Sequence, residues 1–140
     1  MQSKEKADCT VLATQFCLGL SYPEAYALLA KCGRKPRRGF PFRKASGQLW
    51  LETRDELCGM TLMKALEGMQ VGRFVVRISG HVFAVVDGRI FDNGFTNPRC
   101  RVKMVYEANL NDPGFLARYP NLKKLVALDK LPDMRALNCH

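Results

Sequence analysis

Cys9 is the residue of this sequence whose type and position best suit nucleophilic chemistry. Asp8 is a typical N-cap, and the run from Cys9 to Leu18 carries apolar residues at helical spacing until Gly19. A thiol becomes a nucleophile when it loses its proton, and the free N–H groups at the start of a helix stabilise the thiolate. The sequence therefore predicts that Cys9 opens a short helix and ionises more readily than the other thiols.

The other five cysteines lack such a position. Cys17 and Cys32 follow the apolar spacing of helices, which is typical of small core residues, and Cys58, Cys100 and Cys139 have no partner that the sequence identifies. Because the cysteines are scattered singly and no C-x-x-C pair occurs, we expect free thiols, no metal site and no cofactor. The alternative for Cys9 itself is a buried thiol on the core face of an ordinary helix.

His81 is the histidine that is placed to act as a base, since His140, the second histidine of the sequence, is its last residue. It follows Gly80 and opens the run from His81 to Val86, whose β-branched and aromatic residues predict a strand. An imidazole at the accessible start of a strand can take the proton of a nearby thiol. The alternative is a histidine at a strand end that only binds a backbone carbonyl.

Asp92 is the residue that we expect to orient this imidazole. Asp87-Gly88 is a typical two-residue hairpin turn, and with this turn Phe83 faces Asp92 across the hairpin. Residues at even spacing share a face, so His81 lies on the same side as both. A carboxylate that holds the second imidazole nitrogen completes a set of nucleophile, base and orienting group. One extra loop residue would select Asn93 instead.

The elements that must position these residues are helices in the first half of the chain and strands in the second. A capping box of Ser21 and Glu24 predicts a second helix that ends at Gly33, and Thr61 caps a third over Leu62 to Met69. Residues 48–51 fit either a strand or a turn. Strands are predicted over 72–79, 81–86, 89–92 and 101–106, with loops or short helices after 111. We expect a single α+β domain over residues 1–140, with an antiparallel sheet packed on the first helix.

Residues 31–44 form a strongly basic stretch. The chain has a net charge of +9, and this stretch contains seven Lys and Arg and no acid. Because Gly and Pro interrupt it, we expect an exposed loop whose positive field suits phosphates or an acidic partner. The nearby aromatic residues Phe40, Phe42 and Trp50 suit either stacking on nucleic acid or packing of the loop on the core. The candidate anion-binding residues are Arg34, Lys35, Arg37, Arg38, Arg43 and Lys44.

The hydropathy of the chain and its N-terminal sequence indicate where in the cell the protein is located. The apolar runs are far shorter than the roughly 18 residues of a membrane span. Residues 1–8 are charged and lack the apolar stretch of a secretory signal. We therefore expect a soluble, cytoplasmic protein that does not bind membranes.

Two segments resemble the papain-like cysteine peptidases. They are Ala7-Asp8-Cys9-Thr10-Val11, and Gly80 to Gly88 followed by Ile90-Phe91-Asp92. Within that superfamily the chain is most similar to small bacterial and phage proteins that resemble the peptidase domains cutting double-glycine leaders. The resemblance implies a papain-like fold, in which the helix that carries the nucleophile packs on an antiparallel sheet that carries His and then Asp or Asn.

The resemblance also implies the roles of individual residues. It makes Cys9 the nucleophile, His81 the general base and acid, and Asp92 the orienting group. Family members usually have a Gln about six residues before the nucleophile that helps to bind the oxyanion. Here Ser3 occupies that position, and Gln2, one residue further away, is the candidate.

Two functions of different classes follow from these patterns. The first is a thiol hydrolase that uses a Cys-His-Asp triad and an acyl-enzyme, with a peptide or protein as substrate. The triad does not select among amide, isopeptide and thioester bonds. The second is a non-catalytic binding module, which includes a phage-encoded regulator of a host protein, whose basic stretch contacts nucleic acid or an acidic protein.

Overall fold

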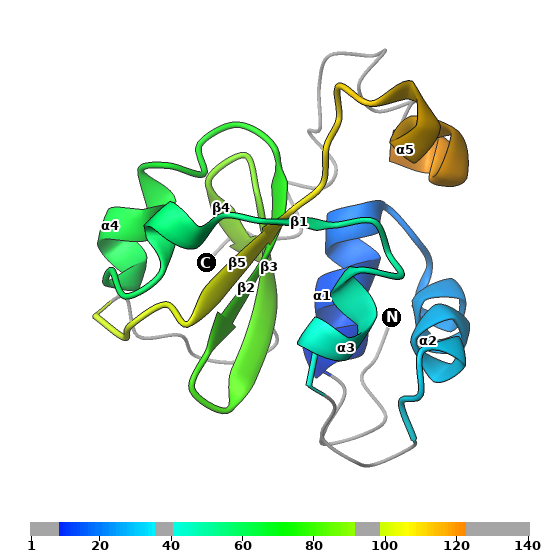
Figure 1. Ribbon diagram of the computed structural model, residues 1–140, viewed down its shortest axis with the longest axis horizontal. Helices are drawn as coiled ribbons and strands as arrows, with labels where there is room; N and C mark the ends of the chain where they lie inside the picture. The colour runs from blue at the N-terminus through cyan, green and yellow to red at the C-terminus, as the bar shows by residue number, and fades with distance from the viewer. Residues whose placement is uncertain (1–8, 36–40, 92–98, 123–140) are drawn as a thin grey trace.

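An antiparallel sheet of five strands lies between two groups of helices in the computed structural model, which describes residues 9–35, 41–91 and 99–122 (Figure 1). The strand order is β1-β5-β2-β3-β4. The strands are β1 (Glu52–Thr53), β2 (Arg73–Ile78), β3 (His81–Val86), β4 (Arg89–Phe91) and β5 (Met104–Glu107). The helices are α1 (Cys9–Leu18), α2 (Tyr22–Lys31), α3 (Arg43–Ser46), α4 (Leu62–Leu66) and α5 (Pro113–Arg118), with a 3-10 turn η1 (Asp55–Leu57).

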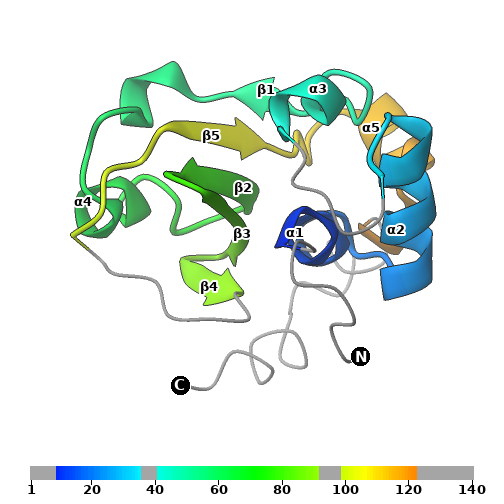
Figure 2. The same cartoon turned by 90° about the horizontal axis from the view of Figure 1, so that it is seen from below.

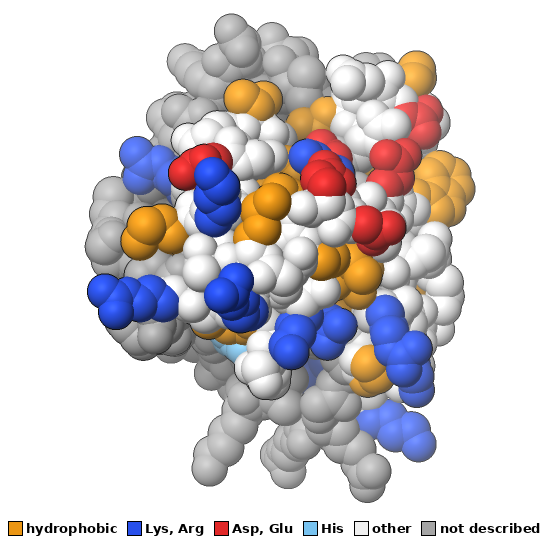
Figure 3. Space-filling view, turned by 60° about the vertical axis from the view of Figure 1, so that its left-hand side comes forward, with side chains coloured by type: hydrophobic (Ala, Val, Ile, Leu, Met, Phe, Trp, Pro, Cys, Tyr) orange, Lys and Arg blue, Asp and Glu red, His pale blue; other side chains and the backbone are white. Residues whose placement is uncertain are grey.

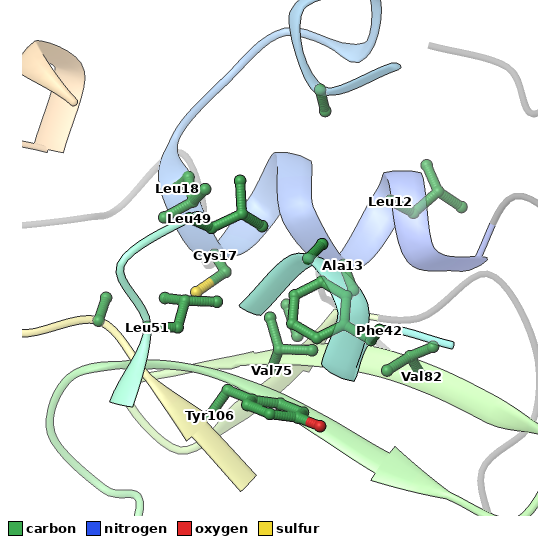
Figure 4. Close-up of a cluster of buried hydrophobic side chains, with 14 of the residues drawn as sticks. Leu12, Ala13, Cys17, Leu18, Phe42, Leu49, Leu51, Val75, Val82 and Tyr106 are labelled. Carbon is green, nitrogen blue, oxygen red and sulfur yellow. The ribbon is translucent and has the colours of Figure 1, made fainter. Parts of the chain in front are cut away.

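The sheet is covered on both faces. Figure 2 shows α1, α2, α3 and α5 on one side of the strands and α4 on the other. On the α1 side, Val75, Val82 and Tyr106 pack with Phe42 and with α1 (Figure 4). The opposite face packs on η1 and α4 through its own apolar cluster. Strands that are buried on both faces are rich in Val and Phe in place of an alternating polar pattern, which explains the apolar runs in the second half of the chain.

The first two helices begin and end where the sequence predicts. α1 spans Cys9–Leu18, and Gly19 follows it with a φ of 67°. At the start of α2 the predicted capping box is present, with the N–H of Ser21 donating to Glu24 Oε1 at 2.9 Å and the N–H of Glu24 donating to Ser21 Oγ at 3.2 Å. These two bonds satisfy donors that a helix start leaves free. The start of α2 is thereby fixed a few residues after the end of α1.

Arg73 attaches the C-terminal end of α1 to the sheet. Its side chain is only 2% exposed, Nε donates to the carbonyl of Cys17 at 2.8 Å, and Nη2 donates to the carbonyl of Phe16 at 2.6 Å. The last carbonyls of a helix have no partner within the helix and carry partial negative charge. A buried guanidinium therefore satisfies them and holds α1 against β2.

The β3–β4 hairpin confirms the predicted two-residue turn. Asp87 and Gly88 have φ values of 49° and 81°, as a type I′ turn requires. Val86 pairs with Arg89 and Ala84 with Phe91, which is the register that the turn predicts. Residues 92 and 93 lie outside the described residues, so the prediction that Asp92 faces His81 stays a prediction.

Other elements differ from the sequence prediction in extent. Residues 47–50 form a turn in which Trp50 has a φ of 65°, and the short strand β1 follows it. The third predicted helix ends at Leu66, and the last predicted strand lies at Met104–Glu107. Asp112 caps α5, the short helix expected after residue 111. None of the helices in the described part of the chain has the length and apolar character of a membrane span.

α5 completes the core that contains α1. Phe115, Tyr119 and Leu122 are buried in the same cluster as Val11 and Leu18. The hydroxyl of Tyr119 donates to the carbonyl of Leu49 at 2.9 Å, which ties the end of the described chain to the turn after α3.

We expect Arg73→Met to lower the free energy of unfolding by about 2 kcal/mol, because it leaves helix-terminal carbonyls without their charged donors. Denaturant unfolding, followed by far-UV circular dichroism, measures this. Arg89→Met, at an exposed position of β4, is the control and should change stability by less than about 0.5 kcal/mol. Equal stability of the two variants would show that Arg73 does not hold α1.

Candidate active site

Cys9 and His81, which lie far apart in the sequence, meet at the start of strand β3. Cys9 is the first residue of α1, and its sulfur is hydrogen-bonded to the side chain of His81 and to the backbone of Val82. These two partners are the first residues of β3. The sequence predicted that the Cys9 sulfur and a His81 nitrogen would lie within hydrogen-bond reach, and the structure brings them together.

The meeting follows from the direction in which α1 packs. The far end of α1 is bound by Arg73, which pairs with Val86 at the end of β3, whereas Cys9 contacts Val82 near its start. Eight helical residues rise about 12 Å, and four strand residues span about 13 Å. This part of α1 and the matching part of β3 are therefore nearly equal in length. Fixing the C-terminal end of α1 sets the position of the thiol at its N-terminal end.

The pKa of the Cys9 thiol reflects two opposing effects. Partial burial raises it, but the hydrogen bonds from the His81 side chain and the Val82 backbone, together with the charge of His81 and the N–H of Thr10, outweigh burial. The pKa is therefore lowered from that of an ordinary cysteine. Donors aimed at the sulfur favour its charged form, as does the start of a helix.

Cys17, on the same helix, shows what burial does without such donors. It is fully buried, and burial raises its pKa to about 12 although Arg73 lies near. Burial also raises the pKa of Cys32 and of Cys100. Cys58 places its sulfur 3.7 Å from the sulfur of Met104. The five described cysteines are all free, as predicted, and the pKa of Cys9 is lowered where that of Cys17, Cys32 and Cys100 is raised.

His81 rests on an aromatic ring. It is half-buried, and its ring centroid lies 5.9 Å from that of Phe83, which projects to the same face of β3 and is itself buried. The packed ring limits the orientations that the imidazole can adopt. His81 thus reaches the thiol from the strand start, where the sequence placed it.

The basic stretch is only partly the exposed loop that the sequence predicted. Arg34 is 4% exposed, with its guanidinium 5.1 Å from the centre of the Tyr26 ring, and Phe42 is buried against Tyr106. The expectation of exposure was wrong for Arg34, whose guanidinium contacts an aromatic ring. For Phe42 the structure selects packing on the core, one of the two alternatives that the sequence left open. Lys35, Arg43 and Lys44 are exposed, and the last two belong to α3.

Several predicted site residues lie outside the described residues. They are the orienting candidates Asp92 and Asn93, the oxyanion candidate Gln2, and the basic residues Arg37 and Arg38. Their roles stay predictions.

Sequence reasoning missed two contributors to the site. The backbone of Val82, which bonds the sulfur, has no signature in a sequence, because any residue presents the same N–H. Arg73 did leave a signal, namely a charge at the start of an otherwise apolar strand, and its partners are revealed only by the packing of α1.

Comparisons of the chain with protein-family models, with curated proteins and with solved structures find no match. The chemistry of the site is therefore inferred from its own residues. They supply a thiol that ionises readily and an imidazole in contact with it, which together can attack an electrophilic carbon and move a proton.

The alkylation of Cys9 by iodoacetamide should show a pH midpoint below that of an ordinary cysteine, because the thiolate persists at lower pH. His81→Ala removes the main hydrogen bond that lowers this pKa, so we expect the midpoint to move to higher pH. Peptide mapping by mass spectrometry across a pH series measures both. Cys58→Ala is the control and should leave the Cys9 profile unchanged. A midpoint that does not respond to His81→Ala would contradict the contact.

Proposed function

We propose that the protein is a thiol-dependent hydrolase of the cysteine-peptidase type, with Cys9 as nucleophile and His81 as general base and acid. One observation carries the proposal. A half-buried thiol at the start of a helix is hydrogen-bonded to an imidazole at the start of a strand, and its pKa is lowered. Perturbed pKa values of paired groups are typical of catalytic sites.

In the first half of the reaction, the proton of Cys9 moves to His81 and the sulfur attacks the carbonyl carbon of the substrate. A C–S bond forms, and the carbonyl π electrons move to the oxygen. When the tetrahedral intermediate collapses, His81 gives the proton to the leaving amine and the C–N bond breaks. The product is an acyl-enzyme on Cys9.

In the second half, water replaces the leaving group. His81 takes a proton from the water, whose oxygen attacks the thioester carbon, and the C–S bond breaks as the carboxylic acid leaves. The returning proton restores the thiol and imidazole pair. Thioester and isopeptide substrates pass through the same steps with a different leaving group.

The oxyanion requires donors that the sulfur does not use. The N–H of Val82 and that of Thr10 bond the sulfur of Cys9, so they stabilise the thiolate. The first N–H groups of a helix have no partner within the helix, and we assign the N–H of Cys9 to the oxyanion. Gln2 is the second donor that the sequence suggests.

The proposed fold family is papain-like. Its support is the order of elements, in which a helix that begins with the thiol packs on an antiparallel sheet whose strand begins with histidine. This agrees with what the resemblance of the two segments implies. By the same resemblance we propose a peptide or protein substrate and Asp92 as the orienting group.

We expect p-nitrophenyl acetate to give a burst of nitrophenol equal to the amount of enzyme, with acetyl found on Cys9. Cys9→Ala should abolish the burst, and His81→Ala should slow acylation by about 100-fold because the base is lost. Stopped-flow absorbance and peptide mapping measure these outcomes. Cys58→Ala should acylate normally.

Acetylation spread over lysines and several thiols, with no preference for Cys9, would contradict the proposal. The protein would then belong to the non-catalytic class, for which salt-dependent binding through the basic stretch is the expected property.

The choice between Asp92 and Asn93 has its own test. We expect Asp92→Ala to slow acylation of Cys9 by about tenfold or more, because the imidazole loses the group that fixes its tautomer. Asn93→Ala should change the rate by less than about twofold. Pre-steady-state acylation rates measure both, and the reverse pattern would assign the orienting role to Asn93.

A further inference from the structure

Arg77 places a guanidinium on the side of the sheet that carries the thiol. Residues at even spacing along β2 share a face. Arg73 on this strand bonds α1, and Val75 packs in the core that contains α1, so Arg77 projects to the same side. The hydroxyl of Tyr106, which belongs to that core, is hydrogen-bonded to Arg77.

Arg77 is level with the first turn of α1. It pairs directly with Val82, whose backbone bonds the Cys9 sulfur. Arg73, four residues earlier, marks the last turn of the same helix. The backbone of Arg77 is therefore level with the thiol end of α1, one strand away from β3.

The positive charge of Arg77 has no carboxylate partner among the described residues. Its Nε is buried and makes no hydrogen bond to any described group. The salt bridges in the described part of the chain involve Arg54 and Lys64. Tyr106 is a neutral partner. A half-buried guanidinium without a counter-charge is suited to bind a carboxylate in bidentate fashion.

Arg43 adds a second charge at the same place. Burial raises the pKa of Tyr106, and the charges of Arg77 and Arg43 both act against that rise. Arg43 therefore lies within electrostatic reach of the hydroxyl that Arg77 binds. The neighbouring residue Phe42 packs on the Tyr106 ring with centroids 5.1 Å apart, which fixes the start of α3 above the sheet (Figure 4).

Charged side chains surround the accessible histidine surface. Figure 3, which looks mainly at the α4 side of the sheet, shows Lys and Arg side chains in the lower part of the view, near the histidine surface, and acidic side chains higher up, some of them beside basic ones. Exposed acids lie on β1 and η1, at Glu52, Asp55 and Glu56. A positive field around the imidazole attracts negatively charged substrates and repels positive ones.

We propose that Arg77, with Arg43, binds the carboxylate of an Asp or Glu side chain in a peptide whose carbonyl Cys9 attacks. The inference rests on the proposed function and names the substrate class of that site. Because Arg77 is level with the first turn of α1, the acidic side chain belongs to one of the first three residues from the attacked bond.

The test uses peptide vinyl sulfones, which alkylate thiols, in pairs that differ only by Glu or Gln at the first, second or third residue from the electrophile. We expect the Glu probe of one pair to alkylate Cys9 about tenfold faster than its Gln partner at low salt. Arg77→Gln should reduce that preference to about twofold or less, and Arg77→Lys should restore part of it. Mass spectrometry of Cys9 measures the rates.

Arg89→Gln is the matched control, because it removes the same charge from an exposed residue of β4 that pairs with Val86, at the end of β3 far from His81. It should keep the preference for Glu. If no pair shows a preference in the unaltered protein, or if Arg89→Gln abolishes it equally, the inference is wrong. If Arg77→Gln does not fold, Arg43→Gln replaces it in the test. We expect Arg43→Gln to halve the preference for the Glu probe, and an unchanged preference would overturn the inference.

Iodoacetamide separates this inference from the proposed function. It carries no charge, so Arg77→Gln should leave its rate with Cys9 unchanged, while His81→Ala should slow it. Normal His81-dependent alkylation without a Glu preference would overturn the acidic substrate alone. A Cys9 that reacts no faster than the other thiols would overturn the hydrolase and, with it, this inference.

Discussion

The hydrogen-bonded contact between the start of α1 and the start of β3 is the interaction on which the site depends. Neither segment forms a reactive centre alone, because the helix supplies a sulfur without a base and the strand supplies an imidazole without a nucleophile. The contact exists only while α1 lies along β3 in the observed direction. Arg73 fixes that direction from the other end of the helix, where it binds the carbonyls of Phe16 and Cys17. A buried charge far from the sulfur thus helps to determine the chemistry at the sulfur.

α1 also shows how one element can hold two thiols in opposite states. Cys9 and Cys17 share a helix; Cys9 is partly buried and Cys17 fully buried, and burial disfavours a thiolate in each case. The difference lies in the donors around the sulfur, since Cys9 meets an imidazole and backbone N–H groups, and Cys17 is enclosed by the apolar core. Solvent exposure alone therefore does not determine the pKa of a thiol in this protein. The number of polar groups that point at the sulfur also determines it.

Local patterns predicted a large part of this structure, because short-range rules govern the elements concerned. The α2 capping box and the β3–β4 turn depend on residues within a few positions of each other, and both are as the sequence predicted. The meeting of Cys9 and His81 was predicted from the chemistry of two positions, each at the start of an element. The burial of Arg34 was missed because its contact with Tyr26 depends on the turn after α2, in which the N–H of Arg34 donates to the carbonyl of Leu29. Arg73 and the backbone of Val82 were missed because tertiary packing selects their partners.

The elements that form the core around α1 are synthesised at different times. α1 is synthesised first, yet β3 supplies the imidazole much later, and α5 closes the same core only with Phe115, Tyr119 and Leu122. A nascent polypeptide therefore carries an isolated thiol until the hairpin has left the ribosome. The contact that lowers the pKa of Cys9 forms only after β3 has been synthesised, so this property belongs to the folded chain and not to the isolated α1 segment.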